Sequence, residues 1–111
     1  MQTKVLIIYP NVAQTATMQM GIASLSAVLK EHDFSVELFD FTFLPMSDMT
    51  ELLKEKIDSY APDIIGVSCR SLEWPTISST LEAISPKAVV VFGGSHATVA
   101  SEEVIAHPIV D

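Results

Sequence analysis

The sequence predicts an α/β fold in which a parallel β-sheet lies between two layers of helices. Continuous apolar runs rich in valine and isoleucine recur along the chain. Such runs are typical of strands that are covered on both faces. Between them, apolar residues repeat every three or four positions, as they do in amphipathic helices. Strands that alternate with helices indicate βαβ units and therefore a parallel sheet.

Four apolar segments are predicted to be strands, and a fifth is predicted to begin near the end of the sequence. Most of them are short, β-branched and bounded by polar residues, glycine or proline, which is the usual pattern of buried strands. The predicted strands cover residues 5–9, 35–41, 64–68 and 88–92, and residues 109–111 have the character of a strand start.

The predicted helices cover residues 22–32, 48–57, 74–84 and 98–106. In the second of them, Asp48 is expected to be the N-cap, with Glu51 as its capping-box partner. The third is expected to begin at Trp74, because Pro75 suits a first helical turn. Pro86 is expected to end it, because proline cannot continue a helix.

Connections between parallel strands are almost always right-handed, which limits how these elements can be arranged. The arrangement that results is a flavodoxin-like (Rossmann-like), doubly wound three-layer sandwich with strand order 2-1-3-4, and a fifth strand beyond the fourth. A length of 111 residues fits one domain, spanning residues 1–111. Because the sequence stops at a strand start, we expect it to be a fragment of a longer chain.

Charge and composition exclude several function classes. The chain carries 14 acidic and 6 basic residues, a net charge of −8. It has no cationic face for nucleic acid, and an anionic membrane surface is disfavoured for the same reason. A single cysteine, Cys69, rules out a disulfide framework and a cysteine-based metal cluster within this chain. With no convincing export signal, we expect the protein to be cytoplasmic.

Ligands of such sheets bind beyond the carboxyl ends of the strands, where the strand order reverses. Residues 10–21, 68–73 and 93–97 are predicted to meet there, and they are rich in hydroxyls and glycine. They contain no carboxylate pair, no phosphate loop and no cysteine–histidine pair close in sequence. We therefore expect no catalytic or metal-ligating residue, and a site that holds a large cofactor. The candidate cofactor-binding residues are Asn11, Met18, Gly21, Ser68, Arg70, Ser71, Gly93, Gly94, Ser95 and His96.

Four sequence patterns, in order and at suitable spacing, resemble one known family. Residues 20–29, followed by 34–36, are similar to its P-L-G-L-x-x-L-A-A-x-L and G-x-x-V wording. Residues 62–68 match P-D-[IV]-[IV]-G-[IVL]-S, and residues 90–98 match [VI]-x-x-G-G-x-H-[AP]-[TS]. Residues 101–103 are similar to the P-E-E that often follows. The chain thus resembles the N-terminal cobalamin-binding domain of cobalamin-dependent radical-SAM enzymes.

The resemblance implies how the cofactor is held. Cobalamin domains of the methionine-synthase kind carry D-x-H-x-x-G after the first strand, and that histidine binds cobalt. Aligned on Gly21, these positions are Ala16 and Met18, which cannot supply that ligand or orient it. The resemblance therefore implies base-off cobalamin without a histidine ligand. It further implies that Ser68 bonds the nucleotide tail and that Arg70 meets a propionamide or the phosphate.

The same resemblance implies that catalysis resides elsewhere in the parent chain. A downstream radical-SAM domain would bind S-adenosylmethionine and an iron–sulfur cluster through C-x-x-x-C-x-x-C, which this chain lacks. The expected reaction is a methyl transfer or a radical rearrangement or cyclisation. The isolated domain is not expected to be catalytic by itself.

Two other functions stay open on the sequence alone. A flavodoxin-like domain that binds flavin mononucleotide is permitted by the fold, although the first loop carries only a faint hydroxyl signal at residues 15–17. A ligand-free scaffold of the same family is the other, and an exposed sheet edge would favour a homo-oligomer. The sequence argues strongly against a signalling receiver domain, because Asn11 and Ser68 stand where acidic residues are needed.

Several candidate residues also have purely structural interpretations. The pair Gly93-Gly94 also suits a plain turn, and His96 also suits a capping role. Cys69 has the character of a buried, inert thiol, and Trp74 that of a packing residue at a helix start.

Overall fold

The computed structural model describes residues 2–12, 20–42 and 44–111 of the chain. Strands and helices alternate along it, which confirms the predicted α/β class. The elements are β1 (Lys4–Tyr9), α1 (Met20–Glu31), β2 (Ser35–Asp40), the 3₁₀ helix η1 (Met46–Asp48), α2 (Met49–Tyr60), β3 (Ile64–Ser68), α3 (Trp74–Ile84), β4 (Val89–Gly93), α4 (Ser95–Val99) and α5 (Ser101–Ala106).

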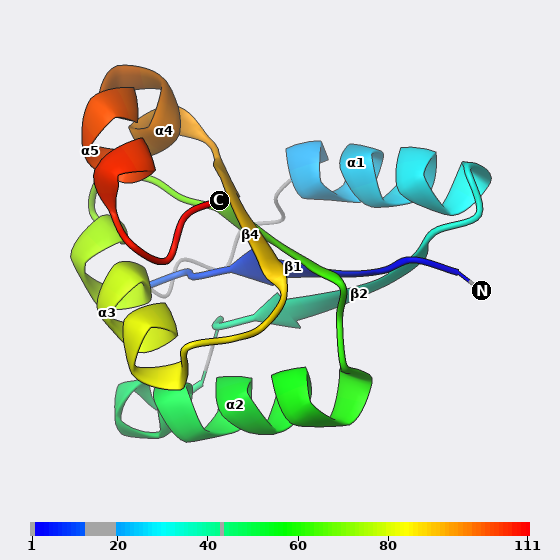
Figure 1. The fold of residues 1–111 in the computed structure, drawn as a ribbon, viewed down its shortest axis with the longest axis horizontal. Coiled ribbons are helices and arrows are strands. Elements are labelled where there is room, and N and C mark those ends of the chain that lie inside the picture. Colours follow the sequence, from blue (N-terminus) through cyan, green and yellow to red (C-terminus); the bar gives the residue numbers. More distant parts are fainter. Residues whose placement is uncertain (1, 13–19, 43) are drawn as a thin grey trace.

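The four strands form one parallel sheet with the order β2-β1-β3-β4. This is the order predicted for a flavodoxin-like sandwich. Ile7 of β1 lies opposite Gly66 of β3, which in turn lies opposite Val91 of β4. Figure 1 shows α1 over one face of the sheet, α2 and α3 on the other, and α4 and α5 beyond the end of β4. The two helical layers and the sheet make the expected three-layer arrangement.

The two faces of the sheet are made by alternate residues of the same strands, because successive side chains of a strand point to opposite sides. On the face toward α2 and α3, the strand residues join a large core in which most side chains are fully buried. On the face toward α1, Val5, Ile7 and Tyr9 pack with Ile22 in a smaller cluster. Ile22 is the one α1 residue that is buried.

The local predictions for α2 and α3 are partly right. Helix α3 begins at Trp74 with Pro75 in its first turn, and it ends at Ile84, followed by the C-cap Ser85, whose backbone is left-handed with a φ of 51°. Asp48 does occupy the N-cap of α2, but its side chain makes no cap hydrogen bond. The predicted capping box is therefore wrong, because η1 leads into α2 and leaves Asp48 with an αR backbone.

The end of the sequence differs from prediction in two ways. The predicted helix 98–106 is two short helices, α4 and α5, which are separated at Ala100. Residues 109–111 do not form a strand, although Asp111 reaches the edge of β4. Its amide donates to the Val90 carbonyl at 3.0 Å, and its carboxylate accepts from the Val90 amide at 2.8 Å.

Among the described residues, no helix combines the length and the apolar character needed to cross a bilayer.

Candidate functional site

A groove of about 420 Å³ opens beside α1, over the face of the sheet that this helix shares with β3 and β4. Its walls are mostly apolar and include Leu25 and Leu29 of α1 and the sheet residues Ile64 and Val91. Val89 and Val91, which point to this face of β4, are each 49% exposed. The described residues thus leave an apolar surface uncovered between α1 and the β4 edge. A mostly apolar groove of this size is typical of sites for small molecules and cofactors.

Two glycines give the groove its depth. A Cβ atom added to Gly66 or to Gly93 would meet no other atom within 4 Å. Both positions therefore face open space, and any side chain there would project into the groove. Gly93 is one of the predicted site residues, whereas Gly66 was not predicted. The sequence did carry a signal for Gly66, because an isolated glycine inside an apolar strand indicates that another group approaches the backbone closely.

The glycine after β4 has a different role. Gly94 has a φ of 92°, and a Cβ there would lie 2.7 Å from the carbonyl oxygen of Cys69. Backbone hydrogen bonds join the same two loops, from the Cys69 amide to the Gly93 carbonyl and from the His96 amide to the Cys69 carbonyl. The segments after β3 and β4 are therefore in direct backbone contact. Only glycine fits between them without strain.

Four of the ten predicted site residues line the groove. They are Gly21, Ser68, Gly93 and Gly94. Ser68 is the last residue of β3 and contributes a hydroxyl group to the groove at the carboxyl end of the sheet. Whether these residues contact a cofactor stays a prediction.

Arg70 is held by the buried carboxylate of Glu73. Its Nη2 donates to Oε2 of Glu73 at 2.8 Å, and its backbone amide donates to Oε1 of the same side chain at 3.0 Å. Glu73 is completely buried. The carboxylate raises the pKa of the Arg70 guanidinium above its ordinary value, chiefly through this hydrogen bond. Nε of Arg70 is buried and forms no hydrogen bond, and Arg70 is not among the residues that line the groove.

Ser71 and His96 bond to each other, with 2.9 Å between the serine Oγ and the imidazole Nδ1. Nε2 of His96 lies 2.8 Å from Oε1 of Glu103, a partner that sequence analysis did not predict. The imidazole also stacks on Trp74, with ring centroids 5.0 Å apart. His96 therefore has a partner at each ring nitrogen.

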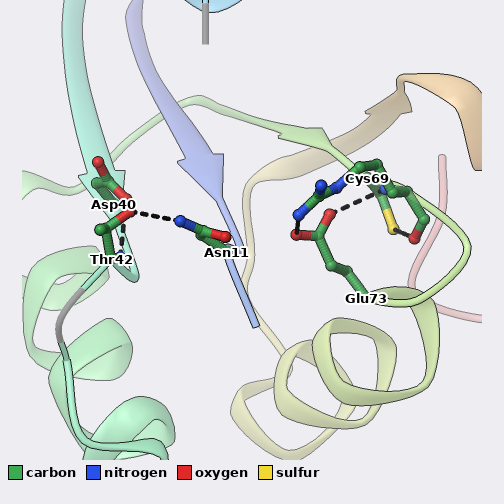
Figure 2. Close-up of polar contacts among 6 residues, drawn as sticks. Asn11, Asp40, Thr42, Cys69 and Glu73 are labelled. Atoms are coloured by element: carbon green, nitrogen blue, oxygen red, sulfur yellow. Dashed lines mark hydrogen bonds and ion pairs between the residues drawn. The ribbon is translucent and has the colours of Figure 1, made fainter. Parts of the chain in front are cut away.

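Asn11 and Ser95, two further predicted residues, do not line the groove. The side chain of Asn11 is completely buried, and its Nδ2 donates to Oγ1 of Thr42 at 2.8 Å. Thr42 in turn donates to Oδ1 of Asp40, so this chain of contacts joins the ends of β1 and β2 (Figure 2). Ser95 is exposed at the start of α4. Met18 lies outside the described residues.

Cys69 is buried and unreactive in character, as its structural interpretation predicted. Burial, with a smaller contribution from Glu73, raises the pKa of its thiol to about 12. Its Sγ donates to the Arg70 carbonyl at 3.2 Å. Within the described part of the chain, no cluster of three or more histidine, cysteine, aspartate or glutamate side chains could hold a metal ion.

Comparison with known proteins identifies the family. Residues 8–111 match the family described as the B12 binding domain. A search of curated proteins gives no match to the sequence.

Two similar solved structures are of the radical S-adenosylmethionine methyltransferase TsrM from Kitasatospora setae. One contains tryptophan substrate and a SAM analogue; it has 24% identity, a TM-score of 0.70, and covers 84% of this chain. The other contains cobalamin and a [4Fe-4S] cluster; it has 25% identity, a TM-score of 0.70, and covers 85%. This chain spans 19% and 18% of the two TsrM chains. Because the family match extends over nearly the whole sequence, the chain belongs to the B12-binding domain family.

Proposed function

We propose that this domain binds cobalamin and that the groove between α1 and the β3–β4 half of the sheet receives the cofactor's nucleotide tail. The observation that carries the proposal is the groove itself, with two glycines at its base and Ser68 at its polar end. The family match and the likeness to a cobalamin-containing TsrM structure support the same ligand.

The residues present fit that group. The tail's benzimidazole is a flat apolar ring, and the walls formed by Leu25, Leu29 and Val91 are apolar. At Gly66 and Gly93 the backbone approaches the groove with no side chain between. The hydroxyl of Ser68 supplies a donor for a polar atom of the ligand, such as a phosphate oxygen or an amide carbonyl.

We further propose that the cofactor is held base-off and without a histidine ligand. All three histidines of the chain lie among the described residues, and each has a partner. His32 bonds the Val28 carbonyl in the last turn of α1 through Nδ1. His107 pairs with Glu82 through Nε2 and accepts from the Ile109 amide through Nδ1. His96 is bonded at each nitrogen. These contacts support a cobalt atom that receives no imidazole from this domain.

The proposed biological role is that of a cofactor module in a cobalamin-dependent radical-SAM enzyme. Bound cobalamin supplies a cobalt centre for methyl transfer or for a radical rearrangement or cyclisation. The one cysteine is buried with a raised pKa and cannot provide a three-cysteine cluster. S-adenosylmethionine and an iron–sulfur cluster would therefore be bound by another domain.

Spectroscopy of the loaded domain tests the proposal. The 111-residue chain is mixed with hydroxocobalamin and desalted, and the bound cofactor is then reduced to cob(II)alamin for electron paramagnetic resonance. We expect cobalamin to co-elute with the protein and to lack superhyperfine splitting from an axial nitrogen. Loss of all cobalamin on desalting would contradict the binding proposal. Splitting from a nitrogen ligand would contradict the base-off assignment, and retention of flavin mononucleotide in a parallel sample would favour a flavin carrier.

A further inference from the structure

We propose that His96 is a positioning residue that locks the loops after β3 and β4 together before any ligand is bound. Its side chain, with Ser71, Trp74 and Glu103, forms a unit that we call the His96 latch. The latch fixes the backbone of Gly93 and Gly94, which lines the groove. Its effect on cobalamin affinity rests on the function proposed above, whereas its effect on the loops does not.

The contacts of the imidazole leave it no freedom to act on a ligand directly. His96 is only 6% exposed, and the ring stacks on Trp74 with an angle of 28° between the planes. The Glu103 carboxylate accepts a hydrogen bond from Nε2 at 2.8 Å, since a carboxylate has no proton to donate. In the neutral ring, Nδ1 then accepts from the Ser71 hydroxyl at 2.9 Å. Any influence of His96 on the groove must therefore act through the loops.

His96 and its two hydrogen-bond partners come from three separate segments. Ser71 follows β3, His96 lies in the first turn of α4, and Glu103 belongs to α5. The single side chain thus joins the loop after β3 to both short helices that follow β4. Neither α4 nor α5 is long enough to be stable alone, since isolated helices need about 12 residues or more. The latch supplies tertiary contacts that hold them.

The backbone beneath the latch is the part that meets the groove. The His96 amide donates to the Cys69 carbonyl at 3.1 Å, and the Cys69 amide donates to the Gly93 carbonyl at 3.0 Å. Gly94 lies between these two bonds, close enough to Cys69 that no side chain fits. When His96 is fixed, this run of backbone is fixed with it. Ordering a loop costs conformational entropy, so a loop that is ordered before binding holds its ligand more tightly.

Three substitutions of His96 distinguish the contributions of its two side-chain hydrogen bonds, one to Ser71 and one to Glu103. His96→Asn places a polar atom near the former Nδ1 and retains a partner for Ser71. His96→Gln is longer and retains a partner for Glu103. His96→Ala removes both. All three lose the stacked ring, so the asparagine and glutamine variants are matched controls for each other.

Hydrogen–deuterium exchange of the ligand-free protein tests the latch first, at the amides of Cys69 and His96. Because a net hydrogen bond contributes about 1 kcal/mol, we expect His96→Ala and His96→Gln to exchange these amides roughly 5–10-fold faster than wild type. His96→Asn should stay within about threefold of wild type, since the bond to Ser71 is the one that joins the β3 and β4 loops. Unchanged exchange in His96→Ala, or equal exchange in the asparagine and glutamine variants, would overturn the proposal.

Hydroxocobalamin titration of the same proteins then measures the consequence for binding. We expect the dissociation constant to rise about 5–10-fold in His96→Ala and His96→Gln and to recover in His96→Asn. A residue that only stabilises the fold would lower the urea midpoint without producing this asparagine–glutamine difference, and that result would refute positioning. If wild type itself binds no hydroxocobalamin, the proposed function fails, and the exchange data alone decide on the latch.

Discussion

The two faces of the central sheet are built from the same strands, but their side chains differ in how deeply they are buried. Toward α2 and α3, Ile65 and Val90 are essentially inaccessible and belong to a continuous core. Toward α1, the adjacent residues Ile64 and Val91 border the groove, and Val91 is half exposed. Close packing of apolar side chains is the main source of folding free energy. The comparison indicates that one face stabilises the domain, while the other keeps apolar surface available for a ligand.

The largest expected effect is a difference in stability between alanine substitutions of two neighbouring isoleucines of β3. Ile65→Ala should lower the free energy of unfolding by about 3 kcal/mol, since it leaves a cavity in a closed core, whereas Ile64→Ala should cost only about 1 kcal/mol. Urea unfolding followed by circular dichroism measures both. Equal losses would mean that the two faces contribute equally to stability, and the comparison would then be wrong.

Filling the groove should separate binding from stability. Gly66→Leu places a side chain in open space, so we expect hydroxocobalamin affinity to fall at least about tenfold. The free energy of unfolding of this variant should equal that of wild type or exceed it by about 0.5–1 kcal/mol, because glycine is unfavourable inside a strand. Spectrophotometric titration and urea unfolding measure the two quantities.

Gly94→Ala is the contrasting control for that substitution. It is expected to destabilise the fold, because its Cβ would collide with Cys69 and its φ of 92° disfavours a side chain. A Gly66→Leu protein that binds cobalamin as well as wild type would show that the groove does not hold the ligand.

The smallest expected effect concerns Cys69, the buried residue that follows β3. The pKa of Cys69 is about 12 in the folded protein, against an ordinary value of 9.0. As pH rises above 9.0, the unfolded chain loses this proton while the folded chain keeps it, so stability must fall. We expect a loss of ~1 kcal/mol between about pH 8 and pH 10, measured against a Cys69→Ala variant that lacks this contribution. Identical pH profiles for the two proteins would argue that the thiol is not desolvated.

The fold was largely predictable because its main signals are local and periodic. Residues 64–67 are a short apolar run with one glycine, and with Ser68 they form the strand β3, as expected. The break at Ala100 was not predictable, since alanine is the strongest helix former and nothing nearby marks an end. There the backbone follows tertiary contacts, which propensity does not record.

The candidate site was predictable only in part, for a related reason. Gly21, Ser68, Gly93 and Gly94 line the groove as parallel-sheet topology implies. The pairing of His96 with Ser71, 25 positions earlier, leaves no periodic trace in the sequence. Nor does the burial of Glu73, a residue type that is usually exposed.

The light anchoring of α1 has a consequence for how the domain adapts to what it binds. This helix buries one residue, Ile22, whereas α2 buries four. A small tilt of α1 therefore exposes little extra apolar area and costs little free energy, while an equal tilt of α2 would open the core. We therefore expect a bound ligand to change the groove's width mainly by shifting α1, while α2 and the core beneath it keep their positions.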